Sequence, residues 1–166
     1  MGKEKLLSAN GIEMNNPHLI RITKISDCLE ALQEFSNCLK SLQQCTSSEK
    51  QSFATKFIKK GNFIIAKDDL DETTGFIAYY ANDAIHKCSY ISMIAVQPQF
   101  RGKHIGSTLM DYCISDCITK GMCYLKLEVS KDNLAAKDFY LKKGFIKSKE
   151  EATATKYFFE KFLHSV

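Results

Sequence analysis

Long apolar runs are missing from this 166-residue sequence. The longest stretch without a charged side chain is 88–100, and Pro98 interrupts it. A membrane-spanning helix needs about 20 apolar residues, so we expect no membrane span. The first residues contain lysines but no apolar core of signal-peptide length, and Leu6 stands where a myristoylation signal has Ser or Thr. We therefore expect a cytoplasmic protein without a membrane partner.

Linker-like segments and internal repeats are also missing. The chain has only two prolines and no Gly/Ser-rich stretch that would separate two domains. Hydrophobic residues make up 45% and charged residues 25%, which is normal for a globular domain and excludes fibrous or wholly disordered classes. We expect a lead-in at 1–17 followed by a single domain at 18–166.

Metal-binding spacings are absent as well. The seven cysteines include no CxxC pair, and no histidine lies at ligand spacing from Cys113 and Cys117. Two thiols do not make a zinc site, so we expect no metal centre and interpret the cysteines as buried, reduced thiols. The net charge is +4, but acids and lysines are interspersed, and the densest basic spots are only Lys59–Lys60 and Lys142–Lys143. This distribution does not favour a nucleic-acid partner.

Hydrophobic periodicity predicts strands and helices in the order β-α-α-β-β-β-α-β-α-β-β, which is typical of a mixed α/β domain. The expected strands are 19–22, 63–66, 76–80, 89–96, 123–130, 145–149 and 155–162, and the expected helices are 25–42, 48–60, 105–120 and 133–143. Because 89–96 is mostly apolar, we expect that strand to be buried on both faces.

Two possible capping boxes mark the starts of the first two helices. Asp27 with Glu30 has the spacing for the first helix, and Ser48 with Gln51 has it for the second. Gly61 suits the end of the second helix.

A basic turn with two glycines follows the strand at 89–96 and opens the next helix. It runs from Val96 through Arg101, Gly102, Lys103, His104, Ile105 and Gly106 to Ser107. Free backbone N–H groups at a helix start bind anions, and the helix dipole favours negative charge there. The segment therefore predicts a phosphate-binding turn, with a plain strand-to-helix connection as the alternative. It matches neither GxxxxGK[ST] nor GxGxxG.

This turn resembles motif A of the GNAT superfamily of N-acetyltransferases, [RQ]-x-x-G-x-[GA]. Arg101 to Gly106 matches it, with His104 in the place of the motif's first glycine. A histidine keeps the backbone N–H and tolerates an unusual φ better than a branched residue.

A second segment, 133–145, is similar to the family's motif B, N-x-x-A-x-x-F-Y-x-x-x-G-F. The two motifs occur in the family's order, and the element order agrees with the family's over the chain from about residue 19. The resemblance implies a GNAT-like mixed, mostly antiparallel sheet of six to seven strands, flanked by about four helices. It also implies acetyl-CoA as co-substrate and a small-molecule or peptide amine as acceptor.

The resemblance implies roles for two catalytic candidates. Tyr140 occupies the family's usual general-acid position, and its alternative role is that of a core aromatic. Glu128 resembles the general base of the ribosomal-protein alanine acetyltransferase branch, and its alternative is a surface carboxylate paired with Lys126. No acid occurs in 90–96, where other branches place one, so a water chain to Asp83, His86 or Tyr80 is the fallback base.

The resemblance also assigns cofactor contacts. Backbone groups of Ile94, Ala95 and Val96 would bind the pantetheine arm and meet the developing oxyanion. Asn133 would contact the cofactor through its amide, or cap the helix that follows it. The rival function is a non-catalytic module that binds acyl-CoA. Exposed sheet edges late in the chain are compatible with a homodimer.

Overall fold

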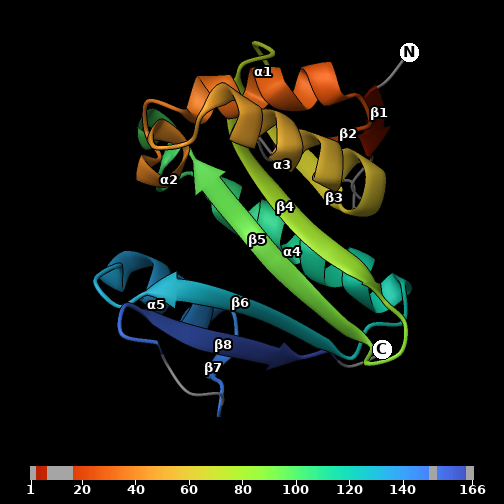
Figure 1. The fold of residues 1–166 in the computed structure, drawn as a ribbon, viewed down its shortest axis with the longest axis vertical. Coiled ribbons are helices and arrows are strands. Elements are labelled where there is room, and N and C mark those ends of the chain that lie inside the picture. Colours follow the sequence, from red (N-terminus) through yellow and green to blue (C-terminus); the bar gives the residue numbers. More distant parts are fainter. Residues whose placement is uncertain (1–2, 7–16, 150–152, 164–166) are drawn as a thin grey trace. The chain divides into compact units, whose positions relative to one another are not determined.

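The computed structural model describes residues 3–6, 17–149 and 153–163, and its strands are hydrogen-bonded in the order β1-β2-β3-β4-β5-β6-β8-β7 (Figure 1). The described residues form two compact units. The first contains the residues up to 79 together with 93–113, and the second contains 80–92 together with the residues from 114 on. Strands β4 and β5 and helix α4 contribute residues to both units, and each unit is described separately below.

The first unit is built on antiparallel strands. β1 (Lys3–Leu6), β2 (His18–Ile22), β3 (Asn62–Lys67) and β4 (Thr73–Asp83) pair in sequence order. Every residue of β3 is buried, because the helices α1 (Ile25–Phe35) and α3 (Ser47–Lys60) pack against this part of the sheet and against each other. The aromatic core centres on Phe76, whose ring lies 4.9 Å from that of Phe35 and 5.0 Å from that of Phe63.

The predicted helix at 25–42 is wrong in its length. The helix α1 ends at Phe35, and a short helix α2 (Lys40–Gln43) follows. Ser36 hydrogen-bonds back to the carbonyl of Leu32, an interaction that competes with regular helix bonding. The apolar periodicity continued past the break because Leu42 of α2 is also buried.

Both predicted capping boxes are also wrong. Lys24 occupies the N-cap position of α1, and its side chain makes no capping hydrogen bond. The helix α3 is capped two residues earlier than expected, at Thr46. Thr46 accepts a hydrogen bond from the Glu49 N–H at 3.2 Å, and the Glu49 carboxylate accepts one from the Thr46 N–H at 2.7 Å. A carboxylate is favoured over the neutral amide of Gln51 at this place because the helix N-terminus is positive. The helix ends at Gly61 as predicted.

The second unit contains the C-terminal strands. β6 (Tyr124–Ser130) pairs in parallel with the first part of β5 (Cys88–Val96), from Cys88↔Tyr124 to Ile91↔Leu127. β8 (Lys156–Phe162) pairs antiparallel with the whole of β6, and β7 (Ile146–Lys147) pairs with β8. The sheet is therefore mixed and mostly antiparallel, as the resemblance implied.

The predicted alternation along β6 is confirmed. Leu125, Leu127 and Val129 are buried, whereas Tyr124 and Glu128 are exposed. Two other strand predictions need correction. The strand expected at 145–149 is only two residues long. The Phe145 N–H donates a hydrogen bond to the Tyr140 carbonyl rather than to a carbonyl of a neighbouring strand.

The expectation that β5 is buried on both faces is also wrong. Ser92 is exposed, and Met93, Ile94 and Val96 are only half-buried. The ladder to β6 covers Cys88–Ile91, so the end of β5 lies beyond it.

The two remaining helices are α4 (Ile105–Thr119) and α5 (Leu134–Lys142), close to their predicted bounds. The predicted buried stripe of α4 is confirmed at Ile105, Leu109, Cys113 and Cys117. Among the described residues, which include all seven cysteines, no disulfide occurs, and four of the thiols are partly exposed rather than buried. No helix in the described ranges has the length and hydropathy needed to cross a membrane.

Candidate functional site

The turn between β5 and α4 has the backbone of an anion-binding loop. A short 3₁₀ helix at Pro98–Phe100 leads into it, and Gly102 and His104 adopt left-handed backbone angles, with φ of +78° and +61°. His104 thus takes the conformation for which the motif has glycine, as its tolerance of unusual φ predicted. Residues 101–104 are exposed, so the turn is open rather than packed shut.

The first turn of α4 presents backbone donors at this place. The first helical hydrogen bond runs from Thr108 N–H to the His104 carbonyl at 3.0 Å. The N–H groups of Ile105, Gly106 and Ser107 therefore precede the helical ladder, and Arg101 and Lys103 add positive charge beside them. The donors, the helix dipole and the charges fit a pyrophosphate group.

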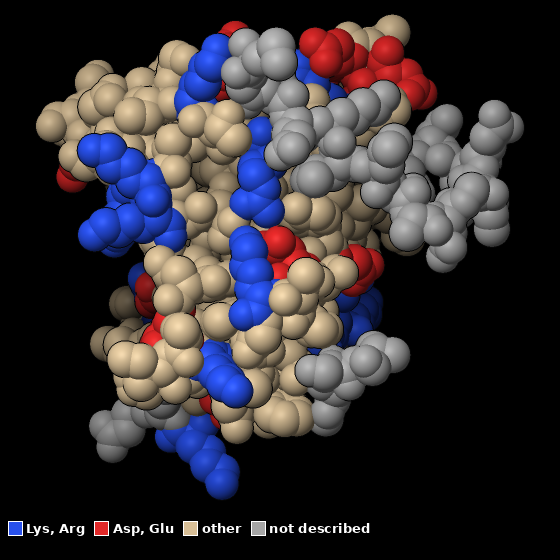
Figure 2. Space-filling model, turned by 90° about the vertical axis from the view of Figure 1, so that its right-hand side faces the viewer, with Lys and Arg blue, Asp and Glu red and all other residues tan. Residues whose placement is uncertain are grey.

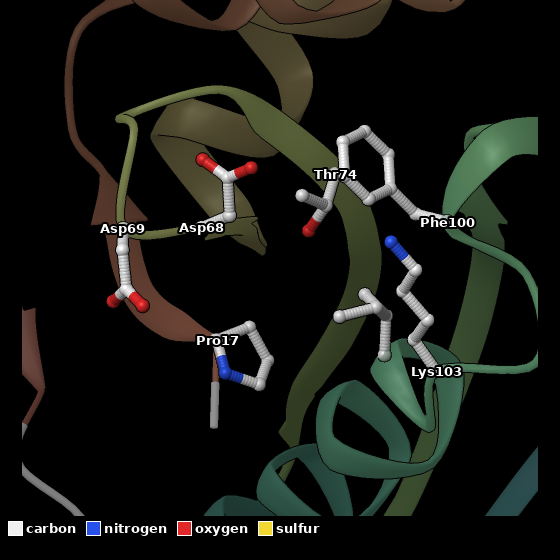
Figure 3. A pocket seen from close by; sticks show the side chains of 7 residues that line it. Pro17, Asp68, Asp69, Thr74, Phe100 and Lys103 are labelled. Carbon is white, nitrogen blue, oxygen red and sulfur yellow. The ribbon is translucent and has the colours of Figure 1, made fainter. Parts of the chain in front are cut away.

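A pocket of about 370 Å³ opens next to this turn (Figure 3). Its lining comes from three places in the first unit: Pro17, Asp68, Asp69, Thr74, Phe100, Lys103 and Ile105. The Lys103 ammonium lies 5.0 Å from the centroid of the Phe100 ring and points into the pocket. Asp68 holds its own turn together by accepting hydrogen bonds from the N–H groups of Leu70 and Glu72. Two of the predicted cofactor residues, Lys103 and Ile105, thus border a cavity of ligand size.

The end of β5 approaches its neighbours closely at Gly75, a residue that no sequence motif indicated. A Cβ at Gly75 would lie 2.9 Å from the carbonyl oxygen of Ala95 and 3.0 Å from Ile105 Cγ2. Gln97 adds two bonds to β4, from its N–H to the Thr74 carbonyl at 2.9 Å and from its amide to the Thr73 carbonyl at 2.6 Å. Gly75 therefore sets the separation between β4, Ala95 and the start of α4.

We expect Gly75→Ala to destabilise the protein by roughly 1–3 kcal/mol, because the added methyl group must displace backbone rather than a flexible side chain. Thermal unfolding measures the loss, with Ser92→Ala at an exposed position of β5 as the control. A variant as stable as the parent would contradict the close approach.

Tyr140 lies in the second unit, on α5. Its side chain is buried, with Phe139 and Phe145 rings at 5.4 and 5.8 Å from its own. Burial raises the pKa of Tyr140 to about 12, because a phenolate would lose hydration there. The hydroxyl therefore keeps its proton over the physiological range. The same residue serves as a core aromatic, so its two predicted roles are compatible.

Glu128 lies on the exposed face of β6, in the same unit. Its carboxylate accepts from Lys156 Nζ at 2.9 Å, and the Tyr90 hydroxyl also bonds it. The lysine bond is the main reason why the pKa of Glu128 lies below its usual range, and the Tyr90 bond adds to it. The surface partner expected from the sequence, Lys126, is thus replaced by Lys156, which β8 brings beside β6 by the register Ser130↔Lys156.

Asn133 caps α5. Its side-chain oxygen accepts from the Ala136 N–H at 3.1 Å, which confirms the capping alternative. Asn133 is exposed, so a cofactor contact through its amide nitrogen stays a prediction.

The fallback groups lie elsewhere in the second unit. The Asp83 carboxylate accepts from the His86 N–H at 3.0 Å and contacts the His86 ring at 2.9 Å, and these bonds lower the pKa of Asp83. Tyr80 is half-buried, and this raises the pKa of its hydroxyl.

The structure brings some candidates together and not others. Glu128, Tyr90 and Lys156 form one hydrogen-bonded group, whereas within the described residues no hydrogen bond or ion pair joins Glu128 to Tyr140. Tyr90 and Lys156 were missed because only the sheet register places them beside Glu128.

The chain is similar to known proteins in its sequence and in its fold. The family model described as "Acetyltransferase (GNAT) family" matches residues 29–145, more than half of the chain. No curated protein matches this sequence.

Solved structures with the same fold are numerous. A protein from Desulfovibrio desulfuricans assigned to the GNAT family superposes with a TM-score of 0.72 at 18% identity, over 88% of this chain and 98% of that one. The ribosomal-protein alanine N-acetyltransferase from Escherichia coli has a TM-score of 0.68 at 16% identity, over 87% and 94%. A Bacillus anthracis protein assigned as a streptothricin acetyltransferase, solved with acetyl coenzyme A, has a TM-score of 0.59 at 22% identity, over 66% and 68%. At these identities the likeness shows the fold.

Proposed function

Since the chain belongs to the GNAT family of acetyltransferases, which use acetyl-CoA, we propose that it transfers the acetyl group directly to a primary amine, with Tyr140 as general acid and Glu128 as general base. The acceptor is an amino sugar, a polyamine, an amino acid or a protein N-terminus. The single observation that carries the proposal is the open turn at 101–107, with its left-handed Gly102 and His104 at the start of α4.

Acetyl-CoA supplies an activated thioester. In the proposal, Arg101, Gly102, Lys103 and the N–H groups of residues 104–107 hold the pyrophosphate. Backbone groups of Ile94, Ala95 and Val96 bind the pantetheine arm, and one N–H there stabilises the oxyanion. Asn133 adds a contact through its amide.

Proton transfer is assigned to the second unit. Tyr140 keeps its proton at neutral pH because burial raises its pKa, and it donates this proton to the departing thiolate. Glu128 is ionised at neutral pH and accepts the proton of the attacking amine, directly or through water. A water chain to Asp83, His86 or Tyr80 is the alternative route.

The distribution of the basic side chains does not favour a nucleic-acid partner. On the face drawn in Figure 2 they lie in separate groups, with acidic and uncharged residues between them. Nucleic-acid binding needs a continuous basic footprint.

A thiol-release assay over a panel of these amine classes tests the proposal, preceded by calorimetric titration with acetyl-CoA. We expect saturable acetyl-CoA binding and thiol release with one class. Absence of acetyl-CoA binding would overturn the proposal.

We expect Glu128→Gln to lower kcat/KM by roughly 100-fold at every pH where the carboxylate is ionised, because the amide cannot accept a proton.

Lys156→Gln removes the main cause of the lowered pKa, so the pKa of Glu128 should rise and the acidic limb of the pH profile should move to higher pH. Glu160→Gln, on the same strand as Lys156, is the control. An unchanged profile in both test variants would assign the base elsewhere.

A further inference from the structure

Three lysine side chains surround the ring of Tyr157 in the second unit. The ammonium of Lys147 lies 4.3 Å from the ring centroid, that of Lys131 5.1 Å and that of Lys137 5.9 Å. Lys147 belongs to β7, Lys131 directly follows β6 and Lys137 belongs to α5, while Tyr157 belongs to β8. Within the described parts of the chain no carboxylate forms an ion pair with any of the three. We call this group the Tyr157 cluster.

The sheet register places the Tyr157 cluster away from Glu128. Tyr157 lies opposite Val129, and neighbours directly opposite each other in an antiparallel pair share a face. Lys147 lies opposite Phe159 and so belongs to this face too. Side chains alternate along a strand, so Glu128, next to Val129, belongs to the other face. The Tyr157 cluster is therefore separate from the candidate base.

The cluster has more positive charge than its own contacts balance. An aromatic ring attracts each ammonium through its quadrupole, but it does not neutralise the charge. Ammonium groups gathered around one ring repel one another, and the first turn of α5, which contains Lys137, adds the positive end of a helix dipole. An anion that accepts hydrogen bonds from several of these groups would relieve the repulsion.

We propose that the Tyr157 cluster binds the dianion of a phosphate monoester. Lysine is a common phosphate ligand that acts as a point charge, and three such charges match a dianion better than a single carboxylate. The three ammonium groups gather around one ring, which fits a single phosphate group.

The phosphate has two possible sources, which share this chemistry. Coenzyme A carries a phosphate monoester on its ribose, and this source rests on the proposed function. The other source is a separate phosphorylated molecule, such as a phosphorylated acceptor.

The test compares Lys131→Gln/Lys137→Gln/Lys147→Gln with Lys24→Gln/Lys59→Gln/Lys142→Gln, which removes the same charge from exposed lysines elsewhere. Both variants and the parent are titrated with inorganic phosphate at constant ionic strength, then with coenzyme A and with 3′-dephospho-coenzyme A. We expect phosphate affinity to fall at least about tenfold in the first variant, since several charge-assisted hydrogen bonds are lost, and to stay near the parent value in the second. Tyr157→Leu, which keeps the lysines and removes the ring that gathers them, should weaken phosphate binding less than the triple variant does.

The titrations with coenzyme A and its dephospho form distinguish the two sources of the phosphate. Loss of the preference for coenzyme A over its dephospho form in the first variant supports the cofactor's phosphate, and an unchanged preference with lost phosphate binding supports a separate molecule. Equal phosphate affinity in the parent and the first variant, or an equal loss in both triple variants, would overturn the proposal. The phosphate titration requires no acetyl transfer, so its failure leaves the proposed function untouched.

Discussion

Tyr140→Phe is expected to lower kcat by roughly 100-fold or more while acetyl-CoA affinity stays unchanged, because only the proton donor is removed. The ring keeps its contacts with Phe139 and Phe145, so the core of the second unit is preserved. Single-turnover thiol release measures the chemical step, and calorimetric titration measures the affinity. Tyr124→Phe, which removes a hydroxyl from a half-exposed tyrosine of β6, is the matched control.

The pH dependence gives a second readout of the same residue. The pKa of Tyr140 is raised to about 12, so the phenol stays protonated well above neutrality. We therefore expect no loss of rate from its ionisation up to about pH 10, the ordinary pKa of tyrosine. A Tyr140→Phe variant with full turnover at all pH values would show that the residue is only a core aromatic.

Gly102→Val is expected to weaken acetyl-CoA binding by about tenfold or more, through the backbone alone. Gly102 has φ of +78°, and a Cβ there would meet no atom within 4 Å. The added Cβ itself therefore meets no neighbour, but a branched residue disfavours the left-handed conformation by about 1–2 kcal/mol. The turn relaxes to another backbone, and the N–H groups before α4 no longer converge.

Gly121→Val provides a closely matched control for this effect. Gly121 follows α4, has φ of +74°, and also has nothing within 4 Å of an added Cβ. Both variants should lose similar thermal stability, but only Gly102→Val should lose acetyl-CoA affinity in a calorimetric titration. Equal affinities in the two variants would show that the turn at 101–107 does not hold the cofactor.

Local patterns were sufficient for most of the fold. The spacing of Ile105, Leu109, Cys113 and Cys117 predicted α4 and its buried face, and the alternation along β6 predicted which residues are buried. Both succeed because side-chain periodicity follows directly from backbone geometry. The order of the two motifs then indicated the family, which the family model shows.

Local competition between similar signals explains the failures. Thr46 with Glu49 and Ser48 with Gln51 both match a capping box, and charge at the helix N-terminus decided between them. The apolar periodicity of α1 continues into α2 although the helix ends before Ser36. Leu42 can be buried without belonging to the same continuous helix.

The sequence alone determined the order of the elements from β2 on, except for α2, as well as the basic turn at 101–107 and the identity of Tyr140 and Glu128 as candidates. Tertiary structure alone decided what surrounds them: Lys156 and Tyr90 on Glu128, Gly75 against Ala95, and three lysines around Tyr157. The physical reason is that strand register joins residues far apart in the chain, and neither periodicity nor spacing encodes which strands become neighbours.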